Sequence, residues 1–156
     1  MLKKMTHVLA VLCLGATPAA IAGPISDNAN QGVVLNVLDE LEIQYSEEED
    51  GSIVFGIDSE FIIAINADKE REILSLVAFK SMEIPAQNRA AALDIINNLN
   101  EEYGMKFWLD QNGNLYSQIV FDTIDMTVSK KCVAASIRRI FAGIEIATEQ
   151  LSSLAN

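Results

Sequence analysis

Apolar positions in the first half of the chain change from a helical to a strand-like spacing. Residues 28–42 carry apolar side chains at the i, i+3 and i+4 spacing of an amphipathic helix. After this helix, alternation at 42–46 and 52–57 on either side of an acidic turn predicts a hairpin. Residues 61–65 are apolar throughout, which indicates a central strand with both faces at least partly covered. A further strand is expected at 72–79.

The second half of the chain predicts two helices and a second hairpin. Residues 85–103 have a helical stripe that begins with Pro and is followed by Gly, the usual stop signal. Strands at 106–110 and 115–121 flank an Asn-Gly turn. A long final helix occupies 127–153 after a Thr or Ser cap. The order α-β-β-β-β-α-β-β-α predicts an α+β domain, a mainly antiparallel sheet flanked by three helices.

The final helix and the strand before the Asn-Gly turn supply the candidate contacts with a partner or a second copy. On a helical wheel the final helix has one wide apolar stripe and an opposite polar ridge that includes Lys131 and Arg138. Ile146 projects from the polar side. Phe107 and Trp108 lie on opposite faces of their strand, so one of them should point away from the core. Trp108 is the preferred anchor for such a contact. For the final helix, the ordinary alternative is a core-packing helix whose polar face is solvated.

The first 22 residues have the layout of a cleavable signal peptide. Two Lys residues precede a short apolar run, then a Pro, and the small-x-small triplet ends at Ala22. The apolar run is roughly half the 20 residues that a membrane anchor needs. We therefore expect cleavage between Ala22 and Gly23, a single domain at 23–156, a location in the periplasm or outside the cell, and no stable membrane insertion after cleavage.

Charge and composition then exclude several kinds of chemistry. The whole chain has a formal net charge of −11, and residues 23–156 carry 9 basic and 22 acidic residues, a net charge of −13. Such a chain is a poor partner for nucleic acid, whose binding depends on Lys and Arg. His7 is the only histidine and precedes the expected cleavage point, which excludes a His-based triad or zinc site in the remainder. Cys132 then remains without an intrachain partner, either as a small buried residue or paired between chains.

Two acidic segments are candidates for metal binding or catalysis. Residues 110–114, Asp-Gln-Asn-Gly-Asn, partly resemble a calcium loop, but Leu115 and Phe121 stand where such a loop needs Gly and a bidentate Glu. A hairpin turn is the better interpretation. Seven acidic residues cluster between 39 and 50, where a weak calcium site, a cationic partner or a pair of catalytic carboxyls is conceivable. A solvated turn accounts for them better, and no metal or other cofactor is expected.

The order of elements resembles the YbjN family, whose fold looks like that of type III secretion chaperones. The resemblance is carried by a helix ending Ile96-Asn97-Asn98-Leu99-Asn100, then Phe107-Trp108-Leu109-Asp110, a turn with Gly113, then Leu115-Tyr116 and the closing amphipathic helix. It covers nearly all of residues 23–156. The family implies a small α+β domain that acts as a chaperone-like or regulatory protein-binding module, and it implies no catalytic residues. Many relatives look cytosolic, whereas this chain has an export signal.

Two functions of different classes follow. The first is a non-enzymatic, exported protein-binding module, homodimeric and with another protein as partner. The second is a carboxylate-based hydrolase or a small-ligand-binding protein of the cell envelope. A pocket with at least two buried carboxylates would favour the second, and a flat apolar patch or smooth groove would favour the first.

Overall fold

The computed structural model describes residues 29–57, 61–68, 70–124 and 127–155. They form a six-stranded antiparallel sheet, in the order β1-β2-β3-β4-β6-β5, with three α-helices. The bounds of the elements are α2 Ala29–Glu40, β1 Tyr45–Glu47, β2 Ile53–Ile57, β3 Phe61–Asp68, β4 Ile73–Lys80, η3 Ala86–Asn88, α3 Arg89–Glu102, β5 Lys106–Leu109, β6 Leu115–Asp122, α4 Lys130–Leu151 and η4 Ser152–Leu154. The predicted α+β class and the order of helices and strands are confirmed. The expected signal peptide and its cleavage point lie outside the described residues.

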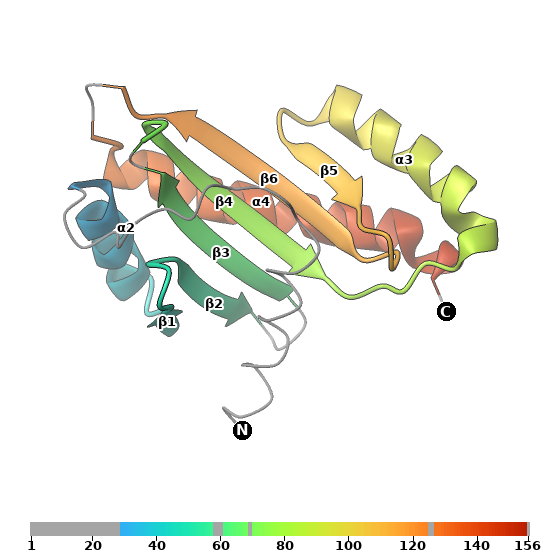
Figure 1. Cartoon of the computed structure of the whole chain (residues 1–156), viewed down its shortest axis with the longest axis horizontal. Helices are drawn as coiled ribbons and strands as arrows, with labels where there is room; N and C mark the ends of the chain where they lie inside the picture. The colour runs from blue at the N-terminus through green and yellow to red at the C-terminus, as the bar shows by residue number, and fades with distance from the viewer. Residues whose placement is uncertain (1–28, 58–60, 69, 125–126, 156) are drawn as a thin grey trace.

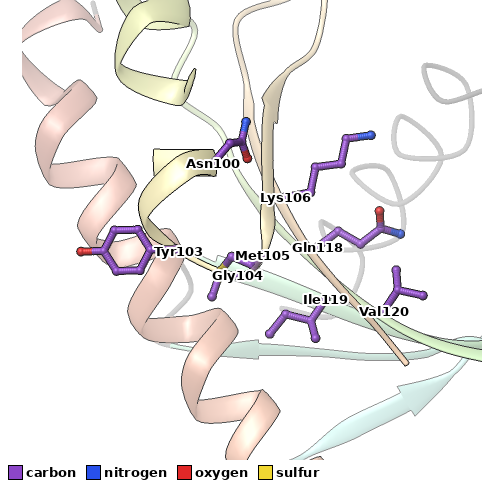
Figure 2. Close-up of a pocket in the computed structure, with 8 residues that line it drawn as sticks. All are labelled: Asn100, Tyr103, Gly104, Met105, Lys106, Gln118, Ile119 and Val120. Carbon is purple, nitrogen blue, oxygen red and sulfur yellow. The ribbon is translucent and has the colours of Figure 1, made fainter. Parts of the chain in front are cut away.

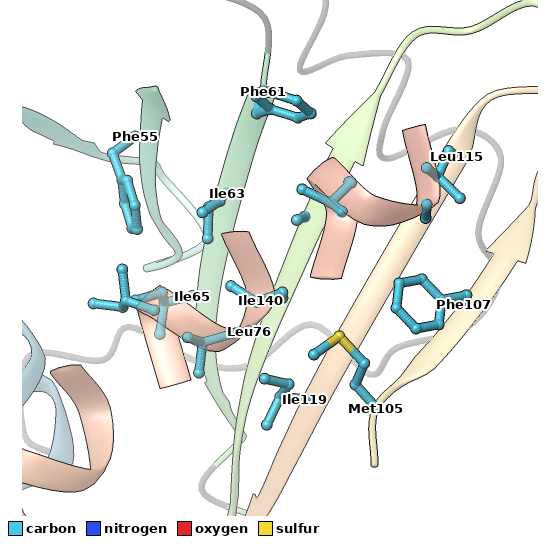
Figure 3. Packing of buried hydrophobic residues seen from close by; sticks show 14 of the residues in the cluster. Phe55, Phe61, Ile63, Ile65, Leu76, Met105, Phe107, Leu115, Ile119 and Ile140 are labelled. Atoms are coloured by element: carbon cyan, nitrogen blue, oxygen red, sulfur yellow. The ribbon is translucent and has the colours of Figure 1, made fainter. Parts of the chain in front are cut away.

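Helix α4 lies across one face of the sheet and closes the hydrophobic core (Figure 1). It begins at an N-cap, because the Ser129 hydroxyl accepts a hydrogen bond from the Cys132 amide at 3.2 Å. Its predicted apolar stripe is buried against β4 and β6, and Ile140 and Ile144 are fully buried. Helices α2 and α3 pack against α4 and add to the same core cluster. Figure 3 shows core side chains of five strands around Ile140.

The strand register lines up one row of buried side chains on the face of the sheet that α4 covers. Facing α4, cross-strand neighbours run Phe55, Ile63, Ala78, Ser117 and Phe107, all of them buried. Next to this row, Gly143 brings α4 unusually close to the sheet. A Cβ atom at Gly143 would lie 2.5 Å from the Met105 sulfur and 3.3 Å from the Phe107 ring. Small residues therefore set the helix-to-sheet distance at this point.

The first helix ends differently from the sequence interpretation. A strand was expected from 42, but residues 41–43 close the end of α2 and β1 begins only at Tyr45. The Ile43 amide donates to the Leu38 carbonyl at 2.9 Å and the Glu42 amide donates to the Asp39 carbonyl at 3.1 Å. Glu42 has a φ of 55°, so these bonds form a Schellman motif with a non-glycine residue at the left-handed position. The prediction of a strand there was wrong because the sequence has no Gly to mark this helix end.

The helix predicted from residue 85 also begins later. Pro85 has a φ of −69° and a ψ of 154°, an extended conformation, and it precedes the short 3₁₀ turn η3. The α-helix itself begins at Arg89. Pro at this position fits the start of a 3₁₀ turn as well as that of an α-helix, because neither uses its missing amide.

Candidate functional site

The face of the sheet opposite α4 carries a second row of side chains, and this row is aromatic. Cross-strand neighbours run Ile62, Phe79, Tyr116 and Trp108. The Tyr116 and Trp108 rings are stacked, with centroids 5.1 Å apart and an interplanar angle of 12°. Phe79 and Tyr116 have centroids 5.1 Å apart. The row is thus a continuous line of ring contacts across β4, β6 and β5, which we call the aromatic row.

The next row on the same face is apolar on β3 and β4 and polar on β6 and β5, where Gln118 and Lys106 follow Ala64 and Val77. The outer positions of the central strands also carry Ala64 and Val77, and Val120 of β6 is 49% exposed. An antiparallel sheet with one solvated face usually alternates apolar and polar residues. In this protein the middle of the sheet is apolar on both faces, whereas the described helices form their core on one face alone. Phe79 and Tyr116 are 9% and 8% exposed, so Trp108 is the aromatic side chain of the row that remains half-buried and open to a partner.

Two charged groups, Lys106 and Asp110, act on the β5 end of the aromatic row. The ammonium group of Lys106 lies 5.4 Å from the centre of the Trp108 ring, within range of a cation–π contact. Burial raises the pKa of the Tyr116 hydroxyl above its usual value, and the negative charge of Asp110 adds to the rise. Tyr116 therefore stays neutral at physiological pH and presents an uncharged ring to its neighbours.

The structure separates the residues that the sequence suggested as partner contacts. Trp108 is half-buried on the outer face of the sheet, and Phe107 is buried in the core, as their alternation predicts. Lys131 and Arg138 are exposed on α4, on the other side of the sheet. Ile146 is half-buried and packs against the hydrophobic core, so part of its surface is already in contact within the chain. The four residues do not form one surface.

The two acidic segments act as turns in the structure. Asp110 accepts hydrogen bonds from the amides of Asn112 and Asn114 at 2.8 and 2.9 Å, which makes residues 110–114 a hairpin turn as predicted. In the other segment, Asp50 accepts from the amide and hydroxyl of Ser52. In the described ranges, no group of three or more His, Cys, Asp or Glu side chains is arranged to hold a metal ion. Cys132 is a free, half-buried thiol in the first turn of α4.

A groove lies beside the end of the aromatic row, where α3 leads into β5 (Figure 2). It has a volume of about 530 Å³. Residues from the end of α3, the turn before β5 and the neighbouring part of β6 line it: Asn100, Tyr103, Gly104, Met105, Lys106, Gln118, Ile119 and Val120. The lining contains no carboxylate. Its charged member is Lys106, and its apolar wall includes Met105 and Ile119.

Asn100 fixes one wall of this groove, a role that the sequence pattern did not indicate. Its side-chain amide donates to the Phe107 carbonyl at 3.0 Å, and its side-chain oxygen accepts from the Phe107 amide at 2.6 Å. The side chain thus replaces a neighbouring strand along the outer edge of β5. A pair of bonds of this kind blocks edge-to-edge association of strands. The Asn-rich end of the helix offered the only signal for it, and an Asn at a helix end has several ordinary roles.

Comparisons with known proteins agree on the fold. A chain of the structure described as "Crystal structure of YbjN, a putative transcription regulator from E. coli" is similar at 13% identity and a TM-score of 0.63, over 79% of this chain and 91% of that chain. A chain of the ExsC-ExsE complex is similar at 15% identity and a TM-score of 0.59, over 85% and 97%. A chain of the HopA1-SchA chaperone-effector complex is similar at 18% identity and a TM-score of 0.51, over 80% of this chain and 91% of that chain.

The sequence comparisons identify the family. The search of the curated proteins finds no match. No helix in the described part of the chain combines the length and apolar character needed to cross a membrane. The family described as "YbjN: Putative bacterial sensory transduction regulator" matches residues 30–150, from α2 to the end of α4. The sequence resemblance is thereby confirmed, and this chain belongs to the YbjN family.

Proposed function

We propose that this chain is a non-enzymatic, exported protein-binding module, chaperone-like or regulatory, which pairs as a two-fold homodimer. Membership of the YbjN family and a fold similar to a chain of a chaperone-effector complex support the binding role. The single observation that carries it is the aromatic row. It places Phe79, Tyr116 and the half-buried Trp108 side by side on the face of the sheet away from α4, and Tyr, Trp and Phe are the residue types enriched in protein interfaces.

Among the described residues, the alternative carboxylate-based hydrolase lacks the pair of buried acids that it needs. Glycoside hydrolysis requires two carboxyls on either side of a bound sugar. Among the described residues, Asp68 is the only buried acid, and its oxygens are engaged in a turn. It accepts from the amides of Glu70 and Arg71, both at 3.0 Å, and lies 3.7 Å from the Arg71 side chain. The groove beside β5 has no carboxylate to pair with it.

Export is the part of the proposal that rests on the N-terminal sequence. We expect protein isolated from the cell envelope to begin at Gly23, because the small residue Ala22 closes the small-x-small triplet. N-terminal sequencing of the purified protein measures this directly. A chain that still begins at Met1 would contradict export with cleavage at this point.

Self-association should depend on Trp108. We expect the protein to sediment as a dimer at micromolar concentration and Trp108→Glu to shift it to monomer. Loss of a central Trp weakens interfaces by about 2 kcal/mol or more. Leu93→Glu is the matched control, because Leu93 is also a large apolar residue, is 40% exposed and lies on α3, outside the aromatic row. A wild-type monomer, or a dimer that Leu93→Glu disrupts instead, would contradict pairing through the aromatic row.

Partner binding is tested by comparing the same two variants in affinity capture. We expect the wild-type chain and Leu93→Glu to retain the same specific protein from an envelope extract, identified by mass spectrometry. Trp108→Glu should lose it, since a buried charge at the centre of an interface is costly. The alternative function would be favoured by a different result: the wild-type chain retains no protein, and both it and Trp108→Glu bind a hydrolase substrate analogue.

A further inference from the structure

The Asn100 side chain shows which way the main chain of β5 faces. Both main-chain groups of Phe107 bind Asn100, so they point away from β6. In an antiparallel pair, residues alternate between those that bond across and those that point outward. Lys106 and Trp108 therefore bond toward β6, opposite Gln118 and Tyr116. By the same alternation along β6, the amide and carbonyl of Tyr116, Gln118, Val120 and Asp122 all point to the β5 side.

Strand β5 is too short to satisfy this side of β6. Its pairing ends at Lys106 opposite Gln118, whereas β6 continues to Asp122. Before Lys106 the chain turns into α3, with the Met105 amide donating to the Tyr103 carbonyl at 2.7 Å. Within the described ranges, no strand pairs with Val120 or Asp122 on this side. Two residues of β6 thus present main-chain donors and acceptors to the space beside the groove.

The groove continues this open edge of β6. Figure 2 shows Met105 and Ile119 on one side of it and Lys106, Gln118 and Val120 on the other. A peptide laid along Val120 to Asp122 would continue the line of β5, with side chains alternating between the two faces of the sheet. An unpaired strand edge next to a side-chain groove is the arrangement that binds extended peptides by strand addition.

We propose that the edge of β6 at Val120 and Asp122 binds an extended segment of a partner protein, which adds to the sheet beside β5. The inference deepens the proposed protein-binding function and rests on it. The charge and burial of the residues around this edge predict which side chains the segment should carry. An acidic residue opposite Val120 would lie near Lys106, an apolar residue opposite Phe121 would face Ile119 and Met105, and a basic residue would stand opposite Asp122.

The test uses a blocked heptapeptide, acetyl-Ser-Thr-Ser-Thr-Lys-Val-Glu-amide, and the purified ¹⁵N-labelled chain. Laid antiparallel to β6, as β5 is, the peptide places Lys, Val and Glu opposite Asp122, Phe121 and Val120. Titration followed by NMR should give saturable shifts that are largest at the amides of Val120 and Asp122, with slower hydrogen exchange at both. Val120→Pro removes the outward amide but leaves the bonds to β4, because Pro is tolerated where the N–H faces an open edge. We expect it to weaken the peptide roughly tenfold or more, through one lost hydrogen bond and a blocked approach. Val120→Thr keeps the amide and the branched shape, and should bind within about twofold of wild type.

The remaining outcomes overturn the inference. Absence of binding, shifts confined to the aromatic row, or equal affinity for Val120→Pro and wild type would each do so, provided the thermal unfolding of the variant is unchanged. Slower exchange of the Val120 amide that grows with protein concentration, without peptide, would identify a second copy as the occupant. The failures are distinguishable, because Trp108→Glu tests the proposed function at the aromatic row. If the peptide binds, but the wild-type chain is a monomer and captures no partner protein, the proposed function is refuted and the edge site stands.

Discussion

Substitution of Gly113 by Ala is expected to cost about 3 kcal/mol of unfolding free energy, because strain and overlap add at one position. Gly113 has a φ of 80°, which an L-residue adopts only at a cost. A Cβ atom at Gly113 would overlap the carbonyl oxygen of Ile84 and lie 2.6 Å from the main-chain nitrogen of Ile84. The same backbone segment is bonded to the turn, since the Ile84 amide donates to the Gly113 carbonyl at 3.2 Å. Neither the turn nor the segment after β4 can move without breaking this contact.

Urea unfolding of the two matched Gly→Ala variants separates this effect from the general cost of replacing Gly. Gly32 lies in α2 and is exposed, and a Cβ atom at this position would meet nothing within 4 Å. Gly32→Ala should therefore raise the unfolding free energy by about 0.5–1 kcal/mol through helix propensity. A Gly113→Ala variant as stable as wild type would show that the hairpin turn is not packed on the Ile84 backbone.

A second large effect is expected where α4 passes closest to the sheet. Gly143→Leu should destabilise the fold by about 3 kcal/mol, because the added side chain enters a core that is already filled. Its Cβ alone would lie 2.5 Å from the Met105 sulfur, and the Phe107 ring blocks the other direction. Ala142→Leu is the control one residue away, at an exposed position, and should change stability by about 0.5 kcal/mol or less.

A double-mutant cycle identifies the cause of the Gly143 effect. Met105→Ala removes the side chain that a residue at 143 would meet. Gly143→Leu combined with Met105→Ala should therefore cost less than the sum of the two single changes, by about 1 kcal/mol or more. Additive costs in thermal or urea unfolding would place the strain elsewhere in α4.

Hydrophobic spacing predicted most of the fold because it records which face of each element is buried. The apolar stripe of α4 and the alternation of Phe107 and Trp108 are of this kind, and both are confirmed. The end of α2 was mispredicted because its left-handed residue is Glu42, and main-chain bonds to Leu38 and Asp39, not a Gly, hold it. Local propensity does not report such bonds.

The candidate site was less predictable than the fold, because it depends on pairs of residues distant in sequence. Trp108 was singled out as pointing away from the core, but its stacking partner Tyr116 follows from strand register alone. The bonds from Asn100 to Phe107, and with them the open edge of β6, depend on the angle at which α3 meets β5. Ile146, chosen from a helical wheel, packs against the core because neighbouring elements reach farther round α4 than the wheel indicates.

The position of α4 after all six strands has a consequence for the order of folding. During synthesis residues 130–151 leave the ribosome after all six strands, so the α4-facing row of the sheet emerges before the helix that covers it. One contact between the start of α2 and the segment before α4 is a hydrogen bond. The Val128 amide donates to the Asn30 side-chain oxygen at 2.7 Å, across 98 residues. Contacts of such separation form slowly, because a long loop must close first. The core of the sheet therefore closes only after α4 has emerged, and until then its apolar row is open to contacts with other chains or with chaperones.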